Sequence, residues 1–276
     1  MSETLLPSSE KPAARIACAT MLTGERYLDG TLVLGHSLRA NGWTGETLAL
    51  VTPDISASAR QKMARYWDRL IEVENIANPN PPEKFGLPQF ATMYTKLRIW
   101  ELEEYSRLVY IDADAIVMGN LDDLKFENVT NAPAFAAAPC MWTPDTFSSG
   151  VLSIAPSRAV FSDMMEKIHS TSSSDGGDQG FLNNYFSDWF FGPSARRLPA
   201  VYNLHQHNYL YAAAWRKHLP ELKILHFTGY KPWELKRPWH RKLLRFWLQR
   251  LTQAAPEGPS PVEIWWETRN KIHATK

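Results

Sequence analysis

The sequence predicts a single α/β domain built around a largely parallel β-sheet. Apolar segments of strand length alternate with helical segments along the first part of the chain, which is typical of βαβ units. Hydrophobic residues make up 44% of the 276 residues, enough for a sizeable core. We find neither an internal repeat nor a second domain in the sequence.

Local signals define the expected elements. Asn41-Gly42 ends the first predicted helix, Ser56 is a good N-cap for the second, and Ser157 caps the helix predicted from residue 158. Prolines 79, 81, 82 and 88 predict a loop over the sheet. In order, we expect strand 15–20, helix 29–40, strand 46–51, helix 57–67, strand 70–73, loop 75–90, helix 92–102, strands 108–111, 116–117, 134–138 and 150–154, helices 158–169 and 179–185, and strand 223–227.

The two ends of the chain differ from this core. We expect residues 1–14 to be disordered and residues 241–276 to form a helical extension packed on the domain. Residues 241–251 are basic and amphipathic, and we interpret them as a helix that closes the domain. Peripheral contact with a membrane surface or a partner is the alternative.

Composition excludes several classes of protein. A net charge of +1 lacks the basic field of a nucleic-acid binder. Cys18 and Cys140 make neither a disulfide scaffold nor a cysteine zinc site, which favours a reducing compartment and a cytoplasmic location. We expect no secretory signal and no transmembrane segment, because no apolar run approaches the ~20 residues that span a bilayer. The 11 tryptophans indicate core packing, with a surface for sugar rings as the alternative.

Two aspartates directly follow the end of one predicted strand. Asp112 and Asp114 follow the apolar strand that ends at Ile111, and open α/β sheets bind ligands beyond the carboxyl ends of their strands. Two such carboxylates repel each other, and a hard divalent cation would remove that cost and also bind a diphosphate. The alternative is a pair of solvated turn acids.

Two later segments carry further candidate groups. The run 175–180 (DGGDQG) combines glycines, which let a ligand approach the backbone, with acids and an amide that can bind sugar hydroxyls. It could also be no more than a capped helix start. His226 ends a predicted strand and could complete a metal site, and Lys231 could neutralise a phosphate; a core histidine and a surface lysine are the alternatives. We expect all three segments to converge at one sheet edge, where they would hold a cation, a diphosphate and a polyol.

With these motifs the sequence resembles glycosyltransferase family 8, the group of glycogenin and galactinol synthase. The similarity extends from about Ile16 to Trp233. It includes Tyr27 with Gly30-Thr31-Leu32-Val33-Leu34-Gly35, Thr95-Lys96-Leu97, Tyr110-Ile111-Asp112-Ala113-Asp114, Phe147-Ser148-Ser149-Gly150-Val151, Asp175-Gly176-Gly177-Asp178-Gln179-Gly180 and His226-Phe227-Thr228-Gly229.

The resemblance implies a GT-A fold, a Rossmann-like catalytic domain over residues 15–240 with a mixed, mostly parallel central sheet. It implies a retaining hexosyltransferase that moves glucose or galactose from a UDP-sugar to a sugar, polyol or glycan. Mn²⁺ is the expected ion, with Mg²⁺ as the alternative, and a homodimer is a further expectation.

The resemblance also assigns site residues. Asp112, Asp114 and His226 would bind the metal ion, and Tyr27 would stack on the uracil. Catalysis would involve Asp178, Gln179 and Lys96, and retention would arise from attack on the leaving group's own face or from a covalent intermediate on Asp178, of which we favour the first. The donor would contact Thr20, Met21, Tyr27, Lys96, Asp112, Ala113, Ser149, Asp175, Gly229 and Lys231.

The chain departs from the family pattern at three places. Ser148 stands where the family often has an asparagine, which leaves the donor sugar open. The segment between Gly and Lys at Lys231 is one residue shorter than usual. Leu210 stands where glycogenin glucosylates its own tyrosine, so self-glycosylation at the neighbouring Tyr209 or Tyr211 stays open.

Two other functions compete with this interpretation. A haloacid dehalogenase-type phosphatase would use Asp112 as its nucleophile, although Ile116 stands where that motif has threonine or valine. Such an enzyme would release phosphate from simple esters without UDP. A non-catalytic nucleotide-sugar binding protein would bind the donor and transfer nothing.

Overall fold

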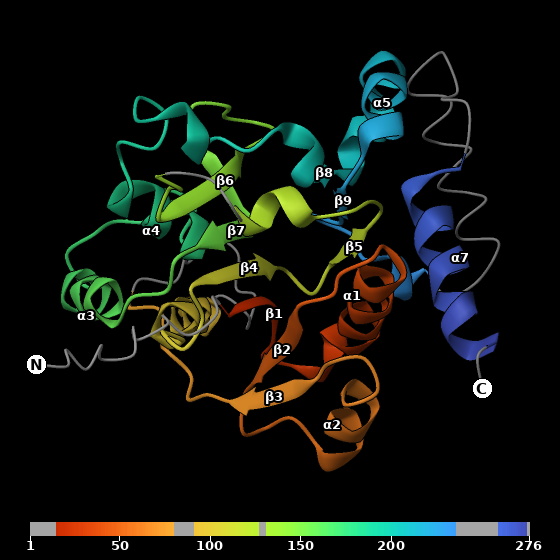
Figure 1. Cartoon of the computed structure of the whole chain (residues 1–276), viewed down its shortest axis with the longest axis horizontal. Helices are drawn as coiled ribbons and strands as arrows, with labels where there is room; N and C mark the ends of the chain where they lie inside the picture. The colour runs from red at the N-terminus through yellow and green to blue at the C-terminus, as the bar shows by residue number, and fades with distance from the viewer. Residues whose placement is uncertain (1–14, 80–90, 127–130, 236–258, 275–276) are drawn as a thin grey trace, which may run out of the picture.

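The centre of the molecule is a mixed six-stranded sheet with helices on both faces (Figure 1). The computed structural model describes residues 15–79, 91–126, 131–235 and 259–274, so the predicted segments 1–14 and 241–251 lie outside the described residues. Strands β3, β2, β1 and β4 are parallel neighbours, whereas β7 runs antiparallel to β4 and β6 antiparallel to β7. The strands, in sheet order, are β3 Arg69–Glu72, β2 Glu46–Val51, β1 Ile16–Leu22, β4 Arg107–Ile111, β7 Phe147–Ile154 and β6 Phe135–Pro139.

The side chains of the central strands alternate between two hydrophobic clusters. In β4, Leu108 and Tyr110 belong to one cluster, and Val109 and Ile111 belong to the other. Because both faces are buried, the strand is a continuous apolar run in sequence. The chain first reaches a partly exposed position at Asp112, immediately after the strand.

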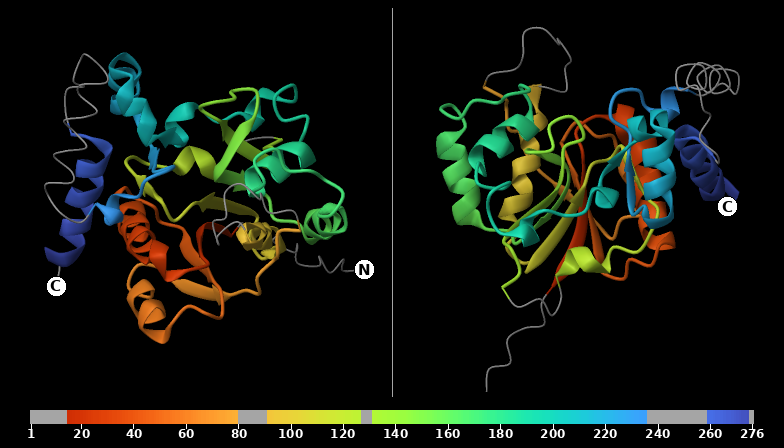
Figure 2. Two further views of the ribbon diagram at one scale, coloured as in Figure 1. Left: turned by 180° about the vertical axis from the view of Figure 1, so that it is seen from behind. Right: turned by 90° about the horizontal axis from the view of Figure 1, so that it is seen from above.

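Helices cover each face of this sheet, as the two views in Figure 2 show. Helices α1 and α2 share one cluster with the sheet, and α3, α4 and the 3₁₀ helix η3 share the other. The predicted N-caps are present, since Ser56 Oγ accepts from Ala59 N at 3.2 Å and Ser157 Oγ from Val160 N at 3.4 Å. The helix predicted over 92–102 has 3₁₀ winding. The bounds are α1 Leu28–Ala40, α2 Ala57–Met63, η3 Met93–Glu101, α3 Arg158–Lys167 and α4 Asp178–Tyr185.

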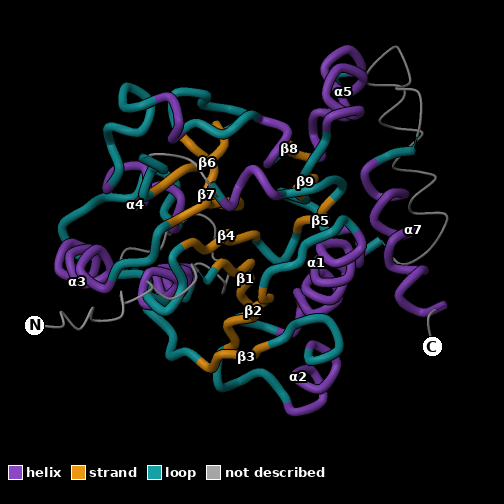
Figure 3. Tube along the Cα trace, in the orientation of Figure 1, coloured by secondary structure: helices purple, strands orange, loops and turns teal. Residues whose placement is uncertain are grey.

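A second, three-stranded sheet stands beside the first one (Figure 3). It consists of β5 Ala115–Val117, β9 Ile224–His226 and β8 Leu204–His205. Strand β5 pairs antiparallel with β9 and places Ala115 opposite His226, and β8 pairs parallel with β9. The sequence analysis predicted neither β8 nor helix α5 (Ala212–His218). Strand β8 was missed because a two-residue strand has no periodicity to detect.

The described part of the C-terminal extension lies against α1. This is helix α7 (Pro261–Ala274), whose Trp265 is fully buried in a cluster with Val33 and Trp233. The Trp266 indole donates to the Pro232 carbonyl at 3.1 Å. Within the described residues, no helix has the length and apolar character that crossing a membrane requires.

Helix α1 packs directly against the acidic turn that follows β4. A Cβ atom at Gly30 would lie 2.3 Å from the Ala113 carbonyl oxygen and 2.8 Å from the Trp233 ring. Only glycine permits this approach, and the backbone of Ala113 is thereby held between the two Asp residues of the turn.

We therefore expect Gly30→Ala to destabilise the protein by about 1–3 kcal/mol, because the added methyl group must displace backbone. Gly24→Ala is the matched control, since no atom lies within 4 Å of a Cβ there and Gly24 is extended, with φ −179°. The control should change stability by no more than about 0.5 kcal/mol. Urea unfolding of both variants tests this expectation, and equal losses would contradict it.

Candidate functional site

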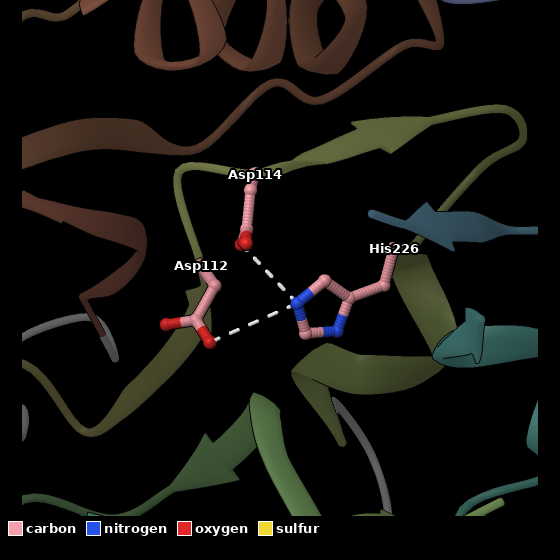
Figure 4. A group of neighbouring side chains, drawn as sticks. All are labelled: Asp112, Asp114 and His226. Atoms are coloured by element: carbon pink, nitrogen blue, oxygen red, sulfur yellow. Dashed lines mark hydrogen bonds and ion pairs between the residues drawn. The ribbon is translucent and has the colours of Figure 1, made fainter. Parts of the chain in front are cut away.

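Asp112, Asp114 and His226 converge at the junction of the two sheets (Figure 4). His226 Nε2 lies 3.2 Å from Asp114 Oδ1 and 4.0 Å from Asp112 Oδ2. One ligand atom from each of the three residues lies within 4.8 Å of the others. Opposite ligands of an ion the size of Mg²⁺ stand about 4.2 Å apart, so small side-chain rotations would let the three residues share one ion.

Asn203 orients the imidazole for this task. Its Oδ1 lies 2.9 Å from His226 Nδ1, and because an amide oxygen only accepts, Nδ1 carries the proton. The lone pair of Nε2 then faces the Asp114 carboxylate, which is repulsive unless a cation lies between them. Metal-bound histidines generally use their second nitrogen in this way, so the donor set fits a divalent ion.

Two buried lysines neutralise the acids. Lys231 Nζ forms an ion pair with Asp114 and donates to the Phe227 carbonyl at 2.6 Å. Lys96 Nζ lies 3.0 Å from Asp112 Oδ1 and 2.6 Å from Asp178 Oδ2. Both ammonium groups therefore lie inside the site rather than in solvent. A lysine that contacts a bound phosphate needs this position.

These contacts shift the acid–base equilibria of the buried groups. Burial acts to raise the pKa of Asp114, but the Lys231 ammonium group outweighs it and holds that pKa well below its usual range; a protonated His226 would add to this effect. Burial acts to lower the pKa of Lys96, and the carboxylates of Asp112 and Asp178 outweigh it, so that pKa is raised. Asp114 and Lys96 are thus charged at physiological pH.

The net charge of the buried cluster favours a divalent cation. Three carboxylates, those of Asp112, Asp114 and Asp178, face the two ammonium groups of Lys96 and Lys231. With His226 uncharged, this cluster carries a net charge of one minus. A divalent ion would change it to one plus, which suits a diphosphate.

The two acids of the DGGDQG segment have different surroundings. Asp175 Oδ1 accepts from Ser173 Oγ, Gly177 N and Gly180 N, each at 2.9 Å, so this oxygen organises the start of α4. Asp178 is only 2% exposed, and its Oδ2 accepts from Ser149 Oγ at 2.8 Å. The Gln179 side chain accepts from Ser149 N at 3.2 Å.

A cavity of about 590 Å³ connects these groups. Thr20 is not among the residues that line it; Thr20 is fully buried, and its hydroxyl donates to the Ile111 carbonyl at 2.7 Å. The other predicted site residues all line the cavity: Met21, Tyr27, Lys96, Asp112, Ala113, Asp114, Ser149, Asp175, Asp178, Gln179, His226, Gly229 and Lys231.

The Tyr27 ring lies at one part of the wall. It meets Trp233 edge-on with ring centroids 5.7 Å apart, and Lys231 Nζ lies 5.7 Å from its centroid. The packing against Trp233 orients the phenol ring next to the acids and leaves it lining the cavity, as stacking on a base requires.

The sequence did not reveal how the imidazole of His226 is supported. Gly150 belongs to a family motif, but its role appears only in the structure: a Cβ there would lie 2.3 Å from His226 Cε1, so glycine is needed for the histidine ring to reach the acids. Asn203 has no recognisable signal in the sequence, since it acts only through His226. Cys140, Trp142 and His205 also line the cavity.

His205 is neutral and has unmet hydrogen-bonding capacity. Burial is the main cause that lowers its pKa, to about 3. Neither ring nitrogen has a hydrogen-bond partner within the described part of the chain.

The two tyrosines considered for self-glycosylation lie in different environments. Tyr209 is 1% exposed, and its ring packs edge-on against Trp215 with centroids 5.5 Å apart. Tyr211 is 55% exposed but does not line the cavity.

Comparison with known proteins identifies relatives of this chain. Residues 18–236 match the family model described as "Glycosyl transferase family 8". Glycogenin-1 of Caenorhabditis elegans is 36% identical over 222 residues, which cover 79% of this chain and 50% of that protein. Mouse glycogenin-1 is 34% identical over 256 residues, covering 91% of this chain and 74% of that protein. The chain thus spans half of the first relative's length.

A solved structure shares the fold. The galactosyltransferase LgtC, in complex with donor and acceptor sugar analogues, matches with a TM-score of 0.60 at 17% identity, over 91% of this chain and 99% of that one. This agreement confirms the predicted GT-A fold with its mixed central sheet.

The hydrogen bond from His226 to Asn203 gives a test of the metal site. We expect Asn203→Ala to weaken Mn²⁺ binding by about 10- to 100-fold, because the imidazole loses the acceptor that fixes its tautomer. Asn203→Asp retains an acceptor and should stay close to the unmodified protein. Free Mn²⁺ measured by electron paramagnetic resonance separates the two; equal affinity in all three proteins would show that Asn203 does not orient the ligand.

Proposed function

The chain belongs to glycosyl transferase family 8, and from this premise we propose that it is a retaining, Mn²⁺-dependent hexosyltransferase that uses a UDP-sugar. The observation that carries the proposal is the junction of the two sheets, where two carboxylates and an oriented imidazole surround one point beside two buried lysines. Glucose or galactose is the proposed sugar. Mg²⁺ is the alternative ion, because the carboxylates accept either metal.

Asp112, Asp114 and His226 would hold the ion, with Asn203 fixing the imidazole. When bound, the ion would supply Lewis-acid stabilisation of the charge that develops on the departing diphosphate. Lys231 would share this task. It now neutralises the Asp114 carboxylate, and a metal ion bound there would neutralise that carboxylate instead. The ammonium group would then be available to a phosphate oxygen.

The other predicted residues would bind the two ends of the donor. Tyr27 would stack on the uracil beside Met21. At the sugar, Ser149, Asp178 and Gln179 form a hydrogen-bonded group whose remaining polar atoms could bind hydroxyls. Asp175 would contribute its second oxygen only, since Oδ1 already accepts three hydrogen bonds.

The surroundings of Asp178 support attack on the leaving group's own face. A carboxylate paired with a cation is a weak nucleophile, and Asp178 Oδ2 accepts from both Lys96 and Ser149. The lysine lowers the nucleophilicity of this carboxylate while keeping its negative charge near the reacting carbon. We therefore propose that Asp178 stabilises developing positive charge and that Lys96 positions it.

The competing functions have less support. Family membership disfavours the phosphatase, and Asp112 shares its carboxylate with Tyr110 OH at 2.8 Å and with Lys96, which would hinder it as a nucleophile. A non-catalytic nucleotide-sugar binding protein would need the same pocket. Measuring turnover of a UDP-sugar distinguishes it from an enzyme.

We expect Asp112→Asn and Asp114→Asn each to lower Mn²⁺-dependent UDP release by at least about 10²-fold, because a neutral amide holds the ion poorly. Asp163→Asn, on the exposed surface of α3, is the matched control and should keep full activity. The measurement is UDP release from a panel of UDP-sugars with Mn²⁺. Full activity of either site variant would refute the metal assignment.

We also expect no glycosyl adduct on Asp178. Incubation with UDP-sugar and Mn²⁺, without acceptor, should leave the mass of the tryptic peptide that contains Asp178 unchanged. Asp178→Asn should reduce turnover by about 10²-fold through loss of charge. A hexose trapped on Asp178 would establish the covalent route instead.

A further inference from the structure

One part of the cavity wall has no task in binding the proposed donor. It consists of Trp142, His205 and Thr228, which we call the rim group. None of the three belongs to the metal site, and none was predicted from the sequence to contact the donor. Their chemistry is that of a sugar-binding surface: a flat apolar ring together with hydrogen-bonding groups.

We propose that the rim group is the acceptor subsite and that it binds the six-membered ring of a saccharide. This inference rests on the proposed hexosyl transfer, because it names the second substrate of that reaction. It also implies that a tyrosine of the chain itself is not the acceptor.

Trp142 supplies the apolar platform. Its side chain is 63% exposed, whereas other tryptophans with described side chains, such as Trp100, Trp215 and Trp265, are almost completely buried. An exposed indole on a cavity wall leaves a large apolar face in water, and covering it with a ligand is favourable. The C–H face of a pyranose matches this ring in size and shape.

The platform is held in place rather than free. The Asn208 side chain donates to Met141 Sδ at 3.5 Å and to the His205 carbonyl at 3.1 Å, which connects the Trp142 loop to the segment after β8. The His207 ring lies 6.1 Å from the indole centroid. These contacts restrain the loop that carries the indole, which lowers the conformational entropy lost when a ligand covers the ring.

His205 supplies the polar groups. It is 5% exposed and lines the cavity, yet neither of its ring nitrogens has a partner in the described part of the chain. Buried polar atoms without partners are costly, so a native site that keeps them is expected to satisfy them with a ligand or ordered water. A neutral imidazole offers one donor and one acceptor, which is what sugar hydroxyls complement.

The backbone around His205 is fixed by Gln206. Its amide nitrogen donates to the carbonyl oxygens of Thr228 at 2.6 Å and Tyr230 at 3.1 Å. The segment that carries His205 is thereby joined to the loop that carries Thr228 and Gly229. These two hydrogen bonds therefore hold the segments of the two rim residues together next to the metal site.

The tyrosines of the chain fit this subsite poorly. Tyr209 is packed against Trp215, and its hydroxyl is buried. Tyr211 is exposed but does not line the cavity, so it cannot serve its own active site without rearrangement of the segment.

The first experiment detects the ligand at Trp142 without needing turnover. The protein is labelled with 5-fluorotryptophan, and the Trp142 signal is identified by its loss in Trp142→Phe. With Mg²⁺ and UDP present, the ligands are methyl glucopyranosides, methyl galactopyranosides, maltotriose, myo-inositol and a tyrosine peptide of residues 203–214. We expect at least one saccharide to shift this signal saturably below about 50 mM, since weak sugar sites have millimolar dissociation constants.

The second experiment measures transfer and donor hydrolysis separately, using the ligand found in the first. Trp142→Ala should lower kcat/KM for transfer at least tenfold more than it lowers acceptor-independent UDP release. His205→Phe, which keeps the ring but removes both nitrogens, should raise KM for the acceptor by about tenfold. Phe191→Ala is the control, because Phe191 is 89% exposed and does not line the cavity.

The outcomes separate this inference from the proposed function. If only the peptide shifts the Trp142 signal, or no ligand of the set does, the saccharide subsite is refuted. A shift by myo-inositol alone refutes the saccharide and assigns a cyclic polyol. If no UDP-sugar is hydrolysed but a saccharide still shifts the signal, the hexosyl-transfer proposal fails and the ring-binding site stands.

Discussion

The pairing of β5 with β9 is the contact on which the candidate site depends. It places Ala115 opposite His226 and so joins residues more than a hundred positions apart in the sequence. Strand β5 begins directly after the acidic turn, and His226 is the last residue of β9. Without this three-residue ladder the histidine would have no fixed position relative to Asp112 and Asp114. The rest of the site is arranged around the same junction.

Close backbone packing and the pairing of buried charges determine which ligands this junction can bind. Gly30 lets α1 touch the acidic turn, and Gly150 lets the His226 ring lie over β7. Three acids in so small a volume would repel each other strongly, and two lysines with little access to solvent offset this repulsion. Because such pairs lie in a low dielectric, each charge strongly affects the next, and an ion or a diphosphate entering the site would redistribute all of them.

The two sides of the cavity are built differently. The donor side consists of strand ends and the start of α4, whose backbone hydrogen bonds leave little freedom. In the rim group, Trp142 and Thr228 lie on loops and His205 ends the two-residue strand β8, and the side chains of Gln206 and Asn208 connect these segments. Loops can change in sequence without disturbing the sheet, so this side is where related enzymes can differ in acceptor. The same division explains why the donor residues have family motifs and Trp142 does not.

The sequence by itself determined the parts that local patterns encode. Apolar strands such as β2 and β4, the N-caps Ser56 and Ser157, and the acids placed just after a buried strand are all properties of short segments, and the structure has them where they were predicted. The resemblance to a family added Tyr27 and Lys96, and the structure places both on the wall of the cavity. Thr20 was expected near the uridine of the donor, and the structure instead places it fully buried in the central strand β1, where its hydroxyl donates to the Ile111 carbonyl.

Only the tertiary structure decided which distant segments meet. The short strand β8, the antiparallel direction of β7, the support of His226 by Asn203 and the position of Trp142 on the cavity wall all depend on contacts between residues far apart in the chain. No period or motif in a single segment records such a contact, because its free energy belongs to the pair and exists only after the chain has folded. That is the physical reason why the acids could be read from the sequence and their partners could not.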